Sequence, residues 1–185
     1  HPQIIPALRK EIHFFDNFYN RGINWYKSCF HTSLLRYYQR KQFHKKIITG
    51  EATPYYLYHP LCAQRISKIL PKAKFIVLLR NPIDRAYSHY VMSVRQGWED
   101  LSFEDAIKLE QKRLEGETEK LIKNKNYYSF KDLVYSYLSR GIYVNQLKTW
   151  MNIFPREQFL LINSEEYSDF PEKILTKVLE FLSLP

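Results

Sequence analysis

Four polar side chains near the start of the sequence could together remove a proton from a substrate. They are Lys10, Glu11, His13 and Asp16. They place a cation, two carboxylates and an imidazole within one short segment, and a carboxylate or imidazole beside an anion site can deprotonate an acceptor hydroxyl. The segment would equally suit a polar edge of the fold whose histidine is only hydrogen-bonded, so both interpretations stay open at this point.

A second pair of residues could bind a phosphate group. Arg80 follows the apolar run 75–79, and Ser88 comes eight residues later. A guanidinium can form a bidentate pair with phosphate oxygens, and a hydroxyl adds a neutral donor. The alternative is a surface arginine and a solvated helix serine.

The residues around Arg80 predict a strand, a turn and a helix. The run 75–79 is continuously apolar, which is typical of a strand covered on both faces of a parallel sheet. Asn81 suits a helix cap and Pro82 suits the first turn. Arg80 would then stand at the carboxyl end of the strand, where ligands of open α/β sheets bind. The helix is expected to pack on the sheet through Ile83, Ala86, Tyr87, Tyr90, Val91 and Val94.

Strands and helices are expected to alternate along the rest of the chain. Further strands are predicted within 46–51 and 158–163, while residues 1–8 look like the tail of a helix and a turn. Residues 110–125 are charged and interrupted by Gly116, which predicts a mobile surface segment. Because no hairpin signals occur, the sheet should be parallel with right-handed crossovers. The other predicted helices cover 25–38, 60–70, 103–114, 140–154 and 171–182.

The composition is that of a globular chain with a basic surface. The 185 residues are 45% hydrophobic and 25% charged, which fits one domain with a substantial core. The net charge of +9 favours an anionic partner, namely nucleic acid, a membrane surface, a glycan or a small polyanion. The basic residues are dispersed and form no nucleic-acid-binding signature, so we expect no nucleic acid partner. No apolar stretch is long enough to span a bilayer.

The two cysteines indicate neither a metal site nor a redox motif. Cys29 and Cys62 lie far apart in sequence and form no C-x-x-C pair, so no metal is expected. We expect free buried thiols and a cytoplasmic location, with a disulfide between the two cysteines as the alternative.

Taken together, the motifs resemble those of sulfotransferases that use 3′-phosphoadenosine-5′-phosphosulfate (PAPS). Arg80-x-Pro82-x5-Ser88 resembles their 3′-phosphate-binding motif. The run KEIHFFD over 10–16, followed by GINWY over 22–26, resembles the K-E-x-H-F-F-D…G-x-x-W-Y pattern of heparan-sulfate sulfotransferases and their bacterial relatives. Two more segments, 50–56 and 140–150, also resemble this family. Ala52 stands where the glycosaminoglycan enzymes carry a lysine, which favours the bacterial branch.

The resemblance implies a fold and a reaction. The fold would be a three-layer α/β/α arrangement with a parallel sheet, similar to P-loop kinases, in a single domain over 1–185. The reaction would transfer a sulfuryl group from PAPS to an acceptor hydroxyl, with carbohydrate favoured as the acceptor and adenosine 3′,5′-bisphosphate as the product. The Golgi lumen is the alternative compartment if the protein is eukaryotic.

The resemblance also assigns roles to residues. Glu11 would be the general base, with His13 as the second candidate, and Arg80 and Ser88 would hold the 3′-phosphate. Glu51 would contact substrate or satisfy loop amides, two roles that the sequence does not separate. The remaining substrate contacts would be Lys10, Asp16 and Tyr143.

One part of the family pattern is missing from the sequence. Family members carry a strand and a phosphate-binding loop with a lysine just before the segment that corresponds to His1-Pro2-x-Ile4, and the five isolated glycines form no such loop here. We therefore expect a fragment, incomplete at both ends, that keeps half of the donor site and is inactive alone. Two other functions remain possible on sequence grounds: a nucleotide-dependent phosphotransferase of related fold, or a non-catalytic basic module that binds RNA or an anionic glycan.

Overall fold

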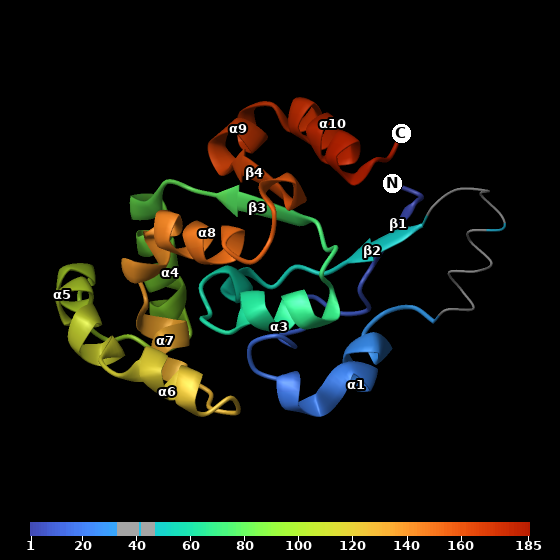
Figure 1. The fold of residues 1–185 in the computed structure, drawn as a ribbon. Coiled ribbons are helices and arrows are strands. Elements are labelled where there is room, and N and C mark those ends of the chain that lie inside the picture. The colour runs from blue at the N-terminus through green and yellow to red at the C-terminus, as the bar shows by residue number, and fades with distance from the viewer. Residues whose placement is uncertain (33–40, 42–46) are drawn as a thin grey trace.

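The strands form two parallel pairs in the computed structural model, which describes residues 1–32, 41 and 47–185 (Figure 1). β1 (Ile4–Pro6) pairs with β2 (Ile48–Gly50), and β3 (Phe75–Leu79) pairs with β4 (Phe159–Asn163). In Figure 1, α9 (Ser164–Asp169) and α10 (Pro171–Leu182) lie on one side of the β3–β4 pair, and α8 (Tyr143–Met151) and α3 (Cys62–Ile69) lie on the other. The predicted α/β class with parallel strands is therefore confirmed.

The helices of the described residues follow the predicted alternation closely. The predicted segments 60–70, 103–114, 140–154 and 171–182 each contain a helix. The first helix begins at Gly22 and not at Trp25, and the rest of the predicted segment, residues 33–38, lies outside the described residues. The helices are α1 (Gly22–Ser28), α3 (Cys62–Ile69), α4 (Pro82–Arg95), α5 (Phe103–Leu114), α6 (Glu117–Lys123), α7 (Phe130–Tyr135), α8 (Tyr143–Met151), α9 (Ser164–Asp169) and α10 (Pro171–Leu182). Short 3-10 turns are η1 (Tyr19–Arg21), η2 (Pro54–Leu57), η3 (Ser139–Gly141) and η4 (Arg156–Gln158).

The prediction of a helix tail within residues 1–8 is wrong, although the predicted turn is present, with the Ile4 N–H donating to the His1 carbonyl at 3.0 Å. Ile4–Pro6 is extended and pairs in register with Ile48–Gly50. The Thr49 hydroxyl also donates to the Ile5 carbonyl at 2.7 Å. The β-branched pair Ile4-Ile5 suits this extended conformation.

One aromatic core joins the amino-terminal loop to the β3–β4 pair. Phe14 stacks on Tyr26 with ring centroids 4.6 Å apart, and Phe75 stacks on Phe159 at 5.0 Å. Trp150 belongs to the same cluster and donates from its indole to the Leu57 carbonyl at 3.0 Å. Both cysteines are buried as free thiols, as predicted. The segment that carries Glu11 and His13 is thereby fixed to the centre of the fold.

The prediction that β3 is covered on both faces is wrong for the described residues. Phe75 and Val77 pack against the core, but Ile76 is 38% exposed and Leu78 is 54% exposed. A continuous apolar run does not show which face has a neighbour, and among the described residues the face with Ile76 and Leu78 remains open.

The predicted inward face of α4 is correct at Ala86 and Tyr90 but wrong at Ile83, Tyr87 and Val94. Ile83 is 72% exposed and Tyr87 is 54% exposed, whereas the buried residues are Ala86, His89 and Ser93. These three follow one another at spacings of three and four, so they form one narrow stripe of the helix. The stripe lets α4 approach α7 and η3 closely, and the helix does not lie on the sheet through its larger apolar side chains.

The charged segment 110–125 is more ordered than its sequence predicts. Gly116, at φ 73°, separates α5 from α6 as expected, but Glu110 and Glu117 are buried. The Glu117 carboxylate accepts hydrogen bonds from the hydroxyls of Tyr127 at 2.8 Å and Ser129 at 2.5 Å. The prediction of a mobile surface segment is therefore wrong, because its acidic side chains are used inside the fold.

The start of α5 provides a test of helix capping. Ser102 Oγ accepts from the Asp105 backbone N–H at 3.2 Å. We expect Ser102→Ala to lower the free energy of unfolding by about 1 kcal/mol, since one N–H then loses its partner. Urea denaturation checks this value. Ser67→Ala, within α3, is the matched control and should be neutral or slightly stabilising, because alanine has the higher helix propensity. Equal effects of the two substitutions would contradict the capping role.

Candidate functional site

The backbone turns sharply at the two residues predicted as base candidates. Glu11 has φ 51° and His13 has φ 54°, both in the left-handed region. Such a conformation costs a non-glycine residue about 1–2 kcal/mol. Ile12 between them is fully buried, and Phe14 after them is 1% exposed. The core therefore holds the backbone in a conformation that leaves the Glu11 and His13 side chains outside the apolar cluster.

Hydrogen bonds from the segment after β2 support this loop from behind. The Tyr56 hydroxyl accepts from the Phe14 N–H at 2.8 Å and donates to the Glu51 carboxylate at 3.2 Å. Thr53 Oγ1 accepts from the His13 N–H at 3.5 Å and donates to Glu51 at 3.0 Å. Burial raises the pKa of Glu51, while hydrogen bonds from the surrounding hydroxyls oppose that change. The oxygens of Glu51 are thus occupied in positioning the loop.

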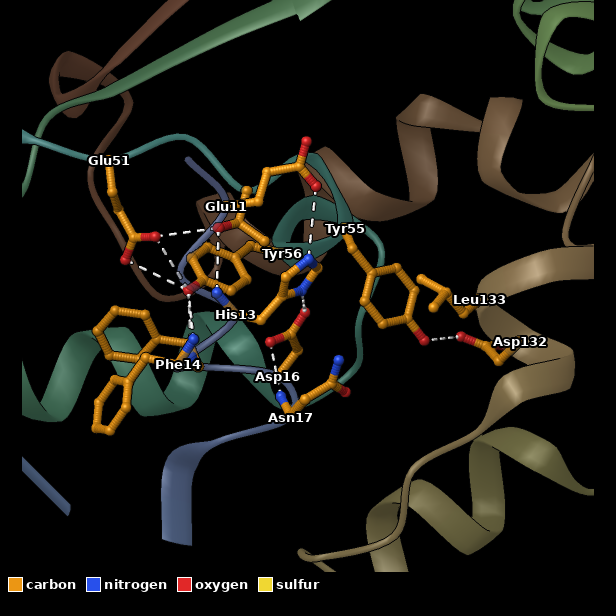
Figure 2. A network of polar contacts seen from close by, with 12 residues as sticks. Glu11, His13, Phe14, Asp16, Asn17, Glu51, Tyr55, Tyr56, Asp132 and Leu133 are labelled. Atoms are coloured by element: carbon orange, nitrogen blue, oxygen red, sulfur yellow. Dashed lines mark hydrogen bonds and ion pairs between the residues drawn. The ribbon is translucent and has the colours of Figure 1, made fainter. Parts of the chain in front are cut away.

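His13 lies between two carboxylates, as Figure 2 shows. Its Nδ1 is 2.6 Å from Asp16 Oδ2, and its Nε2 is 3.5 Å from Glu11 Oε2. The Asp16 side chain is fully buried, whereas the Glu11 side chain is 39% exposed. The buried carboxylate therefore fixes the ring orientation, and the exposed carboxylate is the one that a substrate can reach. Lys10 is more exposed still, with its Nζ 3.9 Å from Glu11 Oε1.

The surroundings of His13 favour its charged form. The hydrogen bond with Asp16 raises the pKa of His13 above 6.5, and this effect exceeds the opposing effect of partial burial. The imidazolium is accordingly stabilised near neutral pH. Its contribution to stability is fully present below pH 6.5 and is lost as the pH rises through the folded-state pKa of His13.

This electrostatic arrangement can be measured by titration. We expect His13 to titrate above 6.5 in the intact protein, and Asp16→Asn to lower its pKa, since the anionic partner is lost. NMR of the imidazole protons checks both values. His89 is the internal control, because burial lowers its pKa to about 3 and Asp16 is not among the causes. An unchanged His13 titration in Asp16→Asn would contradict the assigned pair.

A hollow of about 580 Å³ lies at the carboxyl ends of β3 and β4, and Arg80 lines it. The backbone here is held from two helices. Tyr143 of α8 donates its hydroxyl to the Arg80 carbonyl at 3.0 Å, and Glu165 of α9 accepts from the Asn81 N–H at 3.0 Å. Asn81 Oδ1 caps α4 by accepting from the Ile83 N–H at 2.9 Å. The Arg80 guanidinium makes no hydrogen bond or ion pair with any residue that the structure describes.

The groups around this hollow fit a phosphate. Asp84 lines the hollow, and Ser88, one turn further along α4, is exposed on the same side of that helix. A free guanidinium, a hydroxyl and the amino-terminal end of a 14-residue helix are suitable donors for phosphate oxygens. The acidic residues Asp84 and Glu165 also line the hollow, so Arg80 supplies the positive charge that an anion would need.

The predicted site residues thus fall into two groups. Lys10, Glu11, His13 and Asp16 lie in one loop, with Glu51 behind it. Arg80 lies with Tyr143 at the hollow, so Tyr143 belongs with the predicted phosphate residues and not with the loop.

Two supporting residues were missed by sequence reasoning. Tyr56 was given no role of its own, yet it is 8% exposed and supports the loop. Arg65 was not considered, although it follows Cys62 and precedes Ile66 on the inward face of α3. An arginine at a buried position of an amphipathic helix was the available signal, since such a side chain needs hydrogen-bond acceptors.

Comparison with known proteins agrees with the motifs. The family model described as "Sulfotransferase domain" matches residues 5–185. The solved structure of a sulfotransferase from Alicyclobacillus acidocaldarius is 30% identical, with a TM-score of 0.70, over all of this chain and 72% of that one.

Curated relatives extend well beyond this chain. The membrane-associated sulfotransferase kil1 of Dictyostelium discoideum is 27% identical over all of this chain and 51% of its own length. Heparan sulfate glucosamine 3-O-sulfotransferase 3B1 of Mus musculus is 29% identical over all of this chain and 40% of its own length. The chain therefore spans about half the length of these relatives, or less. Within the described ranges, none of the helices has the length and apolar character needed to cross a membrane. The family model matches residues 5–185, and the fold and the order of the motifs agree with it. This chain therefore belongs to the sulfotransferase domain family.

Proposed function

We propose that the protein transfers a sulfuryl group from PAPS to a hydroxyl of a carbohydrate. The observation that carries this proposal is the row Asp16–His13–Glu11, in which a buried carboxylate orients an imidazole beside an exposed carboxylate. The relatives named for heparan sulfate glucosamine support a saccharide acceptor. When bound, PAPS supplies a sulfuryl group joined to a phosphate that can leave.

Glu11 is the general base in this proposal. Its carboxylate takes the proton of the acceptor hydroxyl while the oxygen of that hydroxyl forms the new bond to sulfur, and the bond from sulfur to the departing phosphate breaks. Glu11 is exposed enough to reach an acceptor, with 39% of its side chain accessible. Positioned proton transfer of this kind contributes a factor of about 10²–10⁴ to a rate.

His13 supports Glu11 in this proposal and does not replace it. Its raised pKa favours the protonated ring, which is a poor acceptor for another proton. Its positive charge beside Glu11 favours the ionised carboxylate. Asp16, whose side chain is fully buried, acts on the acceptor only through His13.

Arg80 and Ser88 hold the 3′-phosphate of PAPS in this proposal. The guanidinium at the end of β3, which has no hydrogen bond or ion pair within residues 1–32, 41 and 47–185, supports that role, and the fixed backbone of Arg80 and Asn81 keeps the donor in register for transfer. Tyr143 acts at the same end by holding the Arg80 carbonyl. Of the other predicted substrate contacts, Lys10 reaches the acceptor, and Glu51 positions the loop.

The proposal can be tested with sulfur-labelled PAPS. The protein at its full natural length is incubated with labelled PAPS and heparan sulfate, and the glycan is then separated and counted. We expect label in the glycan together with adenosine 3′,5′-bisphosphate in solution. Transfer of phosphorus label from ATP with Mg²⁺, and none from PAPS, would indicate a phosphotransferase. Salt-sensitive glycan binding without any transfer would indicate a non-catalytic module.

A further inference from the structure

Arg65 connects two loops that are far apart in the sequence. The first, residues 10–16, carries the proposed base Glu11 and is called the base loop below. The Arg65 side chain is buried, with the residue 5% exposed. Nη1 donates to the carbonyls of Phe15 at 2.6 Å and Asp16 at 2.8 Å, and Nη2 donates to the carbonyl of Lys125 at 2.8 Å. One guanidinium thus holds the backbone at 125 beside the backbone at 15–16.

The second loop, residues 124–129, is also fixed from its other side. Glu117 of α6 is 1% exposed and accepts from the hydroxyls of Tyr127 and Ser129. Asn124 Oδ1 accepts from the Asn126 N–H at 3.1 Å. The residues on both sides of Tyr128 are therefore anchored, and the loop keeps a defined position next to the base loop.

Tyr128 is the tyrosine of this neighbourhood whose ring is available to a ligand. It is 50% exposed, and it makes no hydrogen bond or ring contact with the described residues. By contrast, Tyr55 and Tyr56 are buried, and Tyr127 is bonded to Glu117. Burial and, after it, the charge of Asp16 raise the pKa of Tyr128, which agrees with a position near the base loop.

Each of the two loops that Arg65 joins carries an exposed lysine that could attract an anionic ligand. Lys125, on the same loop as Tyr128, is exposed and forms no ion pair within the described part of the chain. Lys10, on the base loop, is also exposed, and its nearest carboxylate oxygen is 3.9 Å away. An aromatic face and an ammonium group on one loop suit a sugar ring that carries carboxylate or sulfate groups.

We propose that Tyr128 and Lys125 form an acceptor subsite for an acidic saccharide, held against the base loop by Arg65. The Tyr128 ring packs on a sugar ring, and the Lys125 ammonium pairs with an acidic substituent of the saccharide. This inference rests on the proposed function, because it takes the group beside Glu11 to be a saccharide hydroxyl.

The test compares acceptor binding with donor binding. We expect Tyr128→Ala to raise the KM for heparan sulfate about 3- to 10-fold, as the loss of one aromatic contact implies. Tyr128→Phe should stay near wild type because the ring face remains. Lys125→Gln should also raise this KM, and should weaken its dependence on salt. The affinity for adenosine 3′,5′-bisphosphate should not change in any of the three variants.

A second measurement separates this inference from the proposed function. Binding of a heparan sulfate oligosaccharide is measured by calorimetry in the presence of adenosine 3′,5′-bisphosphate, with no turnover. Tyr167→Ala, an exposed tyrosine of α9, is the matched control and should bind like wild type. Transfer by wild type with unchanged KM and oligosaccharide affinity in Tyr128→Ala would overturn the subsite alone. Absence of transfer with every acceptor would overturn the proposed function, while weaker oligosaccharide binding by Tyr128→Ala would still support the subsite.

Discussion

Replacing Glu11 with glutamine should lower kcat by a factor of about 10²–10⁴, since the side chain keeps its shape but can no longer take a proton. The neighbouring His13 is already favoured in its protonated form by Asp16, so it should not substitute for the lost base. The affinity for adenosine 3′,5′-bisphosphate should remain that of wild type, because Glu11 lies in a different loop from Arg80. Steady-state kinetics together with calorimetric nucleotide binding check the two expectations.

The Glu11 prediction has a matched control and a clear contrary outcome. Glu104, in the first turn of α5, is an exposed glutamate outside both groups of site residues, and Glu104→Gln should leave kcat unchanged. A normal kcat in Glu11→Gln would remove Glu11 from the chemistry and transfer the role of base to His13.

Replacing Arg80 with alanine should weaken binding of adenosine 3′,5′-bisphosphate by about 10- to 100-fold, the loss expected for a charge-assisted hydrogen bond to phosphate. The side chain has no partner among the described residues, so its removal should cost little folding stability. Adenosine 5′-phosphate lacks the 3′-phosphate, and its affinity should change far less. Calorimetry with both nucleotides checks this difference.

Two more variants sharpen the Arg80 prediction. Arg80→Lys should recover only part of the affinity, since an ammonium cannot form the bidentate pair. Arg95→Ala, at the other end of α4, removes an exposed arginine away from the hollow and should bind like wild type. If Arg80→Ala binds adenosine 3′,5′-bisphosphate as tightly as wild type, the 3′-phosphate lies elsewhere.

Local signals in the sequence were enough to predict much of the fold. Asn81 caps α4 as expected, because a cap depends on residues two or three positions away, and Ser102 caps α5 in the same way. The parallel pairing of β3 with β4 also agrees with prediction, since buried runs separated by helices leave few alternatives. The buried face of α4 was predicted only in part: hydrophobicity selects Ala86 but also the exposed Ile83 and Tyr87, and it passes over Ser93, which close helix packing buries.

The candidate site was predictable only in part, because some of its contacts join segments that are distant in the sequence. Glu11, His13 and Asp16 are neighbours in sequence, so their proximity could be expected. The supports of their loop come from distant segments: Tyr56 lies 42 positions from Phe14, and Arg65 spans 60 positions to Lys125. No local sequence pattern predicts such long-range contacts. The left-handed backbone at Glu11 and His13 could not be predicted either, because neither residue type is a reliable indicator of a positive φ.

The central claim is that Glu11 performs the proton transfer while Arg80 holds the donor. Its most direct test is single-turnover transfer of labelled sulfuryl to heparan sulfate, measured over a range of PAPS concentrations for wild type, Glu11→Gln and Arg80→Ala. We predict that Glu11→Gln lowers the limiting rate and keeps the half-saturating PAPS concentration, whereas Arg80→Ala raises that concentration and keeps the limiting rate. The claim is contradicted if wild type transfers no label, or if both substitutions change the same quantity.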